Sequence, residues 1–177
     1  GKCDLAKDWY AQFAQAAPED VRGQYLSKAC DYENELLTKN AAIYEVKRME
    51  FNSSLDDFSP AIYKDQVVFS SDRDKGTAVK RDHTWTGNPF NELFVVNAKK
   101  EGAASDYKFT YGKASKFSSK INSKYHDAAV SFSPDYKEIF FTRNNYISGK
   151  AGHDDEGSIL LKVYSAKANG LNGWNDI

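Results

Sequence analysis

A short segment of this sequence occurs twice, as FNSSLDDF at 51–58 and, seventy positions later, as INSKYHDA at 121–128. The residues after each copy also match: 59–73 parallels 129–143, and 93–99 parallels 161–167. These segments are short runs rich in β-branched and aromatic residues, which favour strands. A fixed period of this size is typical of stacked sheet modules such as the blades of a β-propeller. The repeat therefore predicts a mainly β fold.

The repeat predicts two four-stranded blades, at 59–121 and 129–177, and one outer strand at 44–51 that belongs to neither. By the repeat, 116–121 and 174–177 are the corresponding outer strands. In closed propellers an N-terminal strand of this kind commonly completes the last blade. Two blades cannot close a ring and would leave large apolar faces in water. We therefore expect a fragment of a longer propeller within 42–177, with a ring built from several copies as the alternative.

Residues 1–41 are predicted to form a helical hairpin. Apolar residues recur at helical spacing on both sides of Pro18, which suits the first turn of a second helix. The stretch from Trp9 to Asp20 resembles the end of a tetratricopeptide repeat, although one repeat cannot bury its own face. Two interpretations stay open: the end of a tetratricopeptide-like region, or a two-helix cap on the sheet domain. We expect Cys3 and Cys30 to pack as small buried thiols, with a disulfide as the alternative.

Composition limits the classes of partner. The 177 residues include 24 basic and 25 acidic side chains, for a net charge of −1, so nothing steers the whole molecule toward nucleic acid. No apolar run approaches transmembrane length. A hydrophobic content of 41% argues against a disordered chain. We expect a folded protein without a nucleic-acid partner or a transmembrane segment.

The segment FSPDYKEIFFTR at 132–143 resembles the repeat of TolB-type (PD40) propellers, with Tyr136 where that repeat usually has glycine. More widely, 51–74, 85–96, 121–146 and 160–166 look like the first blades of large Bacteroidota envelope proteins. Those proteins combine tetratricopeptide repeats, a propeller and a C-terminal OmpA-like domain, and some are associated with type IX secretion and gliding. The resemblance implies a cell-envelope location in the periplasm, associated with the outer membrane. It implies peptidoglycan binding only through the OmpA-like domain, which this sequence does not contain.

The histidines and acidic residues point to no cofactor or metal. His126 lies in the repeated turn, where a turn or cap role is expected. His83 and His153 have no second histidine or cysteine at metal-ligand spacing. The acidic loop at 153–156 is expected to be a solvated turn, with Ca²⁺ as the alternative. No nucleophile elbow or Cys–His pair appears, and a glycosidase pair of carboxylates is not defined by sequence. We expect no enzymatic activity.

Both predicted blades carry a long insertion between the second and third strands, at 74–91 and 144–158. Such loops project from one face of a propeller, and aromatic and arginine side chains in them commonly anchor interfaces. The predicted partner-binding residues are Lys80, Arg81, His83, Trp85, Asn88, Phe90, Asn144, Asn145 and Tyr146. As alternatives, Trp85 and Phe90 fold back over the blade edge, and the second loop is a solvated turn.

These observations together predict a non-enzymatic envelope scaffold that binds protein partners, with a role as a type IX secretion or gliding component as one option. The location and the secretion link come from the resemblance. A glycan- or peptide-binding propeller sensor is the first alternative, and a hydrolase is the second.

Overall fold

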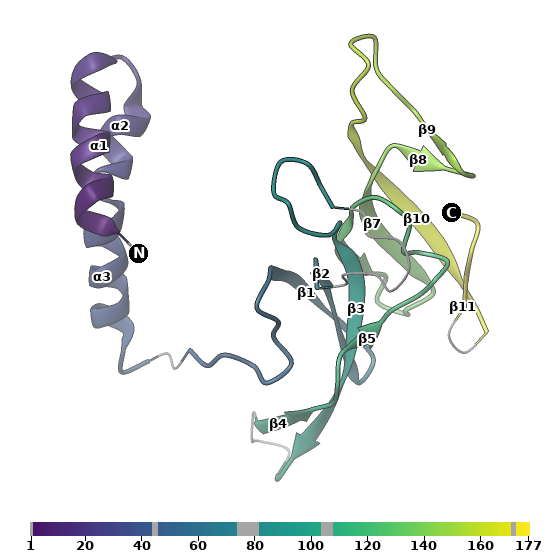
Figure 1. Cartoon of the computed structure of the whole chain (residues 1–177). Coiled ribbons are helices and arrows are strands. Elements are labelled where there is room, and N and C mark those ends of the chain that lie inside the picture. The colour runs from purple at the N-terminus through teal and green to yellow at the C-terminus, as the bar shows by residue number, and fades with distance from the viewer. Residues whose placement is uncertain (1, 44–45, 74–81, 104–107, 171–172) are drawn as a thin grey trace. The chain divides into compact units, whose positions relative to one another are not determined.

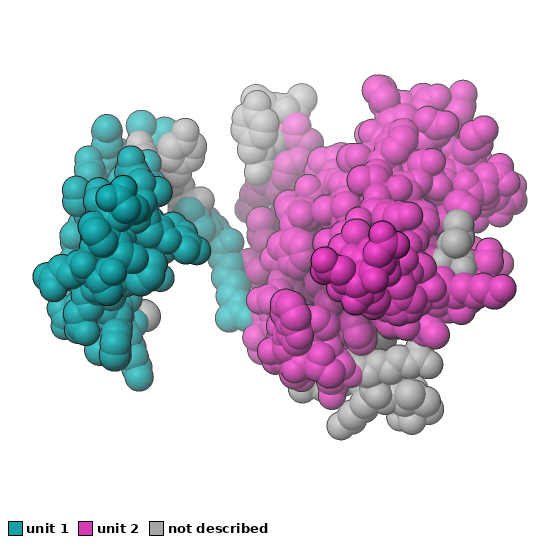
Figure 2. Space-filling model, turned by 90° about the horizontal axis from the view of Figure 1, so that it is seen from above, with its two compact units in different colours: residues 1–48 teal, residues 49–177 magenta. Residues whose placement is uncertain are grey.

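The structure, a computed structural model, describes residues 2–43, 46–73, 82–103, 108–170 and 173–177 (Figure 1). The chain divides into two compact units, residues 1–48 and 49–177, which are coloured separately in Figure 2. By residue content the chain is mainly β with a small helical part, as the repeat predicts. None of the described helices is long and apolar enough to cross a membrane.

The first unit holds α1 (Cys3–Ala16), α2 (Val21–Leu26) and α3 (Ala29–Asn40). The predicted second helix is therefore broken near Ser27, whose hydroxyl donates to the carbonyl of Gln24. Such side-chain bonds to the backbone compete with a continuous helix. Asp20 caps α2 by accepting from the backbone N–H of Arg22 at 3.0 Å.

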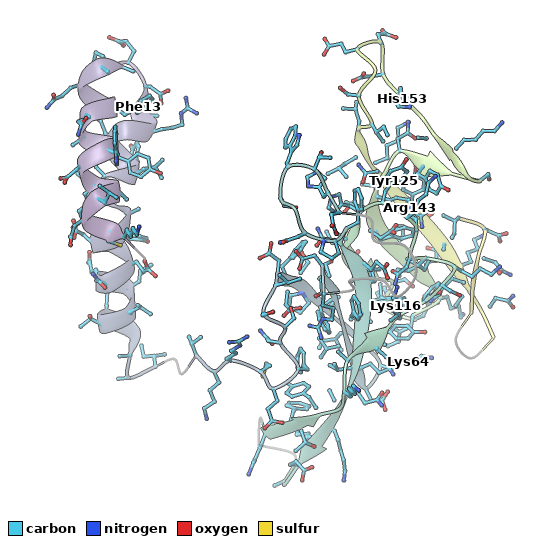
Figure 3. The ribbon with its side chains drawn as sticks, viewed as in Figure 1. Phe13, Lys64, Lys116, Tyr125, Arg143 and His153 are labelled. Carbon is cyan, nitrogen blue, oxygen red and sulfur yellow. The ribbon has the colours of Figure 1, made fainter. Side chains whose placement is uncertain are left out.

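The helices of this unit bury little. Among its described residues Gly23 alone is buried, since it packs against Ala14 of α1. Large apolar side chains such as Trp9 and Phe13 stay exposed, and Phe13 is labelled in Figure 3. Cys3 is disulfide-bonded, so the prediction of a buried free thiol is wrong for Cys3. The structure does not establish a tetratricopeptide repeat, which stays a prediction.

The second unit holds two antiparallel sheets and a small hairpin. The first sheet contains β1 (Asp57–Tyr63), β2 (Gln66–Ser71), β3 (Glu92–Glu101), β4 (Lys108–Tyr111) and β5 (Ser115–Lys116), in the order β1-β2-β3-β4 with β5 also on β3. The second sheet contains β6 (Asp127–Phe132), β7 (Glu138–Asn144), β10 (Leu161–Asn169) and β11 (Gly173–Asn175), in the order β6-β7-β10-β11. The hairpin pairs β8 (Tyr146–Ile147) with β9 (Lys150–Ala151).

The two copies of the repeat take equivalent strands. Both first strands contain a bulge followed by the same pairing, Ala61 with Val68 in one sheet and Ser131 with Phe140 in the other. The turn differs, because the first hairpin closes at Tyr63 and Gln66, whereas the second continues to a backbone bond from the N–H of Ser133 to the carbonyl of Glu138. The second turn is thus two residues longer. Equivalent residues lie 70 positions apart in the first and third strands and 72 apart in the second strands.

The predicted outer strands differ from the structure. Residues 46–51 form no strand, and 44 and 45 lie outside the described residues. Strands need a hydrogen-bonded neighbour, and no described strand pairs with this run. The run 116–121 contributes only Lys116 to a strand, as part of β5. After Phe117, whose N–H donates to the carbonyl of Leu93, the chain turns, and the N–H of Asn122 donates to the carbonyl of Ser118. At the other predicted outer strand, β11 does pair with β10, over 173–175.

The main core lies between the two sheets. Tyr63, Val68 and Leu93 of the first sheet pack with Ile139, Phe141 and Trp174 of the second. A smaller cluster on the other face of the first sheet contains Phe69, Phe94 and Val96, with Phe51 and Tyr111 against them. The arrangement of these sheets as propeller blades stays a prediction.

Candidate functional site

A buried ion pair holds the repeated turn at the end of the second sheet. The Asp127 side chain is completely buried, and its Oδ1 accepts from Nε of Arg143 at 2.6 Å. Its Oδ2 accepts from the backbone N–H of Ser123 at 2.5 Å. Arg143 also donates to the carbonyl of Ile121 and lies over the rings of Phe141 and Tyr164. The pair therefore ties the turn at 121–127 to strands β6, β7 and β10.

The first sheet contains an ion pair of the same kind, with its arginine at a different strand position. Oδ1 of Asp57 accepts from Arg73 at 2.5 Å, and Oδ2 accepts from the backbone N–H of Ser53 at 2.6 Å. Arg73 also donates to the carbonyl of Phe51 at 2.9 Å. Its guanidinium lies 4.9 Å from the ring centre of Phe69 and 5.2 Å from that of Phe94.

The two arginines reach equivalent partners from non-equivalent strand positions. In the sheet registers Asp127 pairs with Arg143, whereas Asp57 pairs with Ser71. The residue equivalent to Arg143 is therefore Ser71, and Arg73 bonds back to that serine hydroxyl at 2.9 Å. Both arginines lie 16 residues after their aspartate, and because the first turn is two residues shorter, Arg73 stands two residues further along its strand than Arg143.

The two carboxyls differ in their proton affinity. Burial is the strongest influence on both and disfavours the charged form. In Asp57 the hydrogen bonds from Arg73, Ser71 and Ser53 outweigh burial and lower the pKa. In the fully enclosed Asp127 burial prevails over the bond from Arg143 and raises the pKa. Both are structural groups that shape the turns.

These turns carry a cluster of aromatic and imidazole rings where the two predicted insertions meet. The His126 ring centre lies 4.8 Å from that of His83 and 4.7 Å from that of Phe90. Phe90 in turn packs edge-on against Tyr125 at 5.7 Å, and Tyr125 against Tyr146 at 5.1 Å. The segment leading into β3 and the β8–β9 hairpin both lie at this end of the sheets (Figure 1).

His126 is the centre of the cluster. Its Nδ1 lies 3.1 Å from the backbone nitrogen of Asn91, which donates to it, and its own backbone N–H donates to Oδ1 of Asn144 at 3.0 Å. Burial and the neighbouring His83 lower the pKa of His126, against an opposing effect of Asp72. The imidazole is thus held as a neutral acceptor for Asn91, and with its backbone N–H His126 joins three segments, consistent with the expected turn role.

Trp85 and Phe90 separate in role. Trp85 is 91% exposed, and its ring contact to the cluster within the described residues is with His83, at 6.1 Å between ring centres. The alternative in which Trp85 covers the blade edge is therefore wrong. Phe90 is half-buried and does fold back onto His126 and Tyr125.

The three predicted asparagines make bonds inside the protein. Asn88 donates to Oδ2 of Asp72 at 3.0 Å, and its carbonyl accepts from the N–H of His83. Asn144 accepts from His126. Asn145 exchanges backbone bonds with Gly152 and Leu160, which holds the β8–β9 hairpin. They position the loops.

Sequence reasoning missed Lys124, Tyr125 and His126 as members of this group. Nζ of Lys124 lies 5.4 Å from the ring centre of Tyr125 and 5.0 Å from that of Tyr146, so a cation borders the aromatic group. The predicted residues Lys80 and Arg81 lie outside the described residues. We call the exposed and half-exposed side chains at this end the loop surface; it comprises His83, Trp85, Phe90, Lys124, Tyr125, His126 and Tyr146.

The acidic loop closes on itself. Oδ1 of Asp154 accepts from the backbone N–H groups of Glu156 and Ser158, and Nδ1 of His153 lies 2.8 Å from the carbonyl oxygen of Gly157. Within the described part of the chain, no three His, Cys, Asp or Glu side chains come together as metal ligands. The loop's geometry is that of a turn.

Comparison of the chain with protein-family models, with curated protein sequences and with solved structures gave no match.

Proposed function

We propose that this protein is a non-enzymatic scaffold of the bacterial cell envelope that binds protein partners through the loop surface. The periplasmic, outer-membrane-associated location and the link to type IX secretion or gliding rest on the resemblance to the Bacteroidota envelope proteins. The same resemblance supports a propeller built from the two sheets. The proposal of protein binding rests on the geometry of the loop surface.

The observation that carries this proposal is the exposure of Trp85, whose large ring is 91% exposed beside a group of packed rings. His83, Phe90 and His126 hold one another in that group, so these side chains lose little conformational entropy on binding. Tryptophan and tyrosine are enriched among residues that dominate interface energetics. Lys124 at the border adds a charge that favours partners with acidic groups near the contact.

The test is affinity capture from envelope extracts with wild type and Trp85→Ala. Losing a central anchor costs about 2 kcal/mol or more, about thirty-fold in Kd. Since the ring is exposed, the melting temperature should barely move. Tyr25→Ala is the matched control, because Tyr25 is an exposed aromatic of the helical unit. If both variants retain the partner equally well, the loop surface is not the binding site.

A glycan- or peptide-binding sensor is the second candidate, favoured by the exposed Trp85 ring, on which a sugar face could stack. Against it, Asn88, Asn144 and Asn145 already bond within the protein, which leaves fewer amides for hydroxyl groups. Saturable glycan binding that Trp85→Ala abolishes, with no protein captured, would favour this candidate over the scaffold.

A further inference from the structure

The interface between the two sheets shows which face of one repeat unit packs against which face of the next. The first sheet contributes Tyr63, Val68 and Leu93, and the second contributes Ile139, Phe141 and Trp174. Side chains alternate between the faces of a strand, so each sheet also has an outer face turned away from this interface. The registers identify the equivalent residues on those outer faces.

The outer face of the first sheet carries residues equivalent to those with which the second sheet packs against the first. Its Ile62, Val67, Phe69 and Tyr111 are equivalent to Phe132, Ile139, Phe141 and Trp174. These four residues and Pro60, together with Met49, Phe51 and Phe58, line a groove of about 330 Å³. We call it the groove face. Ile62 is 62% exposed there, whereas its equivalent Phe132 packs against the main core.

The outer face of the second sheet repeats the pattern of the first sheet's inner face. Phe140 is equivalent to the buried Val68, and Val163 to the buried Leu93. Val163 is 74% exposed, and Leu161, two residues before it on the same side of β10, is 65% exposed. Phe140, Leu161 and Val163 form what we call the Val163 face.

The two outer faces are therefore related to each other as the two inner faces are. We propose that the groove face of one copy of this chain binds the Val163 face of a second copy, continuing the sheet-on-sheet packing seen inside each copy. The occupant is a second copy because the same chain carries both halves of the match. Contiguous exposed apolar faces of this kind mark interaction sites.

The contact is heterologous, since two different surfaces meet. Such contacts propagate from copy to copy, into a ring where the rotation closes and into an open chain where it does not. Wild-type protein should therefore pass from monomer to species larger than a dimer as its concentration rises.

The test is sedimentation velocity across a concentration series with Ile62→Lys, which alters only the groove face, and Val163→Lys, which alters only the Val163 face. Each variant alone should stay monomeric. Mixed together they should form a one-to-one complex that grows no further, because each supplies the face that the other lacks. Val21→Lys is the control: Val21 is 58% exposed in the helical unit, and this variant should associate like wild type.

Both substituted side chains are largely exposed, so the variants should fold, which near-ultraviolet circular dichroism checks. A wild type that stays monomeric at the highest soluble concentration would overturn the proposal. So would variants that associate like wild type, or a mixture of the two that forms no complex.

Discussion

Replacing Asp127 by alanine should destabilise the sheet unit far more than the same change at Asp57. The Asp127 side chain is fully buried, and that of its partner Arg143 is 6% exposed. Removing the carboxylate leaves a buried guanidinium without its counter-ion, which costs about 3–5 kcal/mol. It also leaves the Ser123 N–H unpaired, a smaller loss that overlaps with the first.

At Asp57 the expected loss is smaller. The side chains of Asp57 and Arg73 are 8% and 15% exposed, so the freed guanidinium can turn toward water. A hydrogen bond to a charged group contributes about 1.5–3 kcal/mol, which sets the expected loss at this site. The difference between the two variants should thus be about 2 kcal/mol, although both aspartates bond to an arginine and to a backbone N–H of the repeated turn.

Urea unfolding followed by Trp174 fluorescence measures both losses, because Trp174 lies buried between the sheets. Trp9→Phe and Trp85→Phe in the background remove the other two tryptophans. Asp127→Ala with Arg143→Met should recover part of the loss, since no unpaired charge remains. Asp155→Ala, at an exposed carboxylate, should change stability by less than about 0.5 kcal/mol. Equal losses at Asp127 and Asp57, or no recovery in the double variant, would refute the account of the buried charge.

Three further predictions concern other parts of the molecule. The pKa of His126 is lowered by burial and by His83, so its contribution to stability is fully present above about pH 6.5 and is lost as the pH falls below that value. Urea titrations at pH 7 and pH 5 should show that the free energy of unfolding falls more in wild type than in His126→Asn. Equal decreases would exclude His126 as the cause. Gly23→Ala should destabilise the helical unit despite the better helix propensity of alanine, because a Cβ there would lie 2.9 Å from Ala14. Amide hydrogen exchange in α1 should become faster, and unchanged exchange would contradict the prediction. The double variant Ser71→Arg with Arg73→Ser moves the arginine of the first sheet to the position equivalent to Arg143. Its urea midpoint should lie near that of wild type, whereas Arg73→Ser alone should lower the midpoint. Equal midpoints of the single and double variants would show that the arginine acts only from position 73.

The mainly β fold could be predicted because the pattern of alternating residues is local and appears twice. The predicted strands that the structure lacks would each need a neighbouring strand to form hydrogen bonds with. Residues 46–51 alternate like a strand, yet pattern alone does not supply a neighbour to pair with. Similarly, Phe117 continues the bonding to Leu93 beyond β5, but the chain then turns and the Asn122 side chain bonds to the backbone of Leu93. Helical spacing also does not reveal the break near Ser27, where the serine hydroxyl donates to the carbonyl of Gln24.

The candidate site was predicted in part. Trp85 and Tyr146 came from the insertions, whose position between strands is visible in the sequence. Lys124, Tyr125 and His126 were missed as members because they join the loops only in three dimensions, 35 positions beyond Asn91 in the case of His126. A usable signal existed: the repeated turn leads into the same end of the strands as both insertions.

The unequal hairpin turns limit how this repeat can lengthen or shorten. Two extra residues at 134–137 carry Phe140 and Phe141 along β7 without exchanging their faces, because side chains alternate with a period of two. A single-residue insertion would turn the buried Phe141 outward and bring Thr142 into the core. Turn lengths in this architecture should therefore vary by even numbers, and an odd insertion should require a compensating bulge in the same strand.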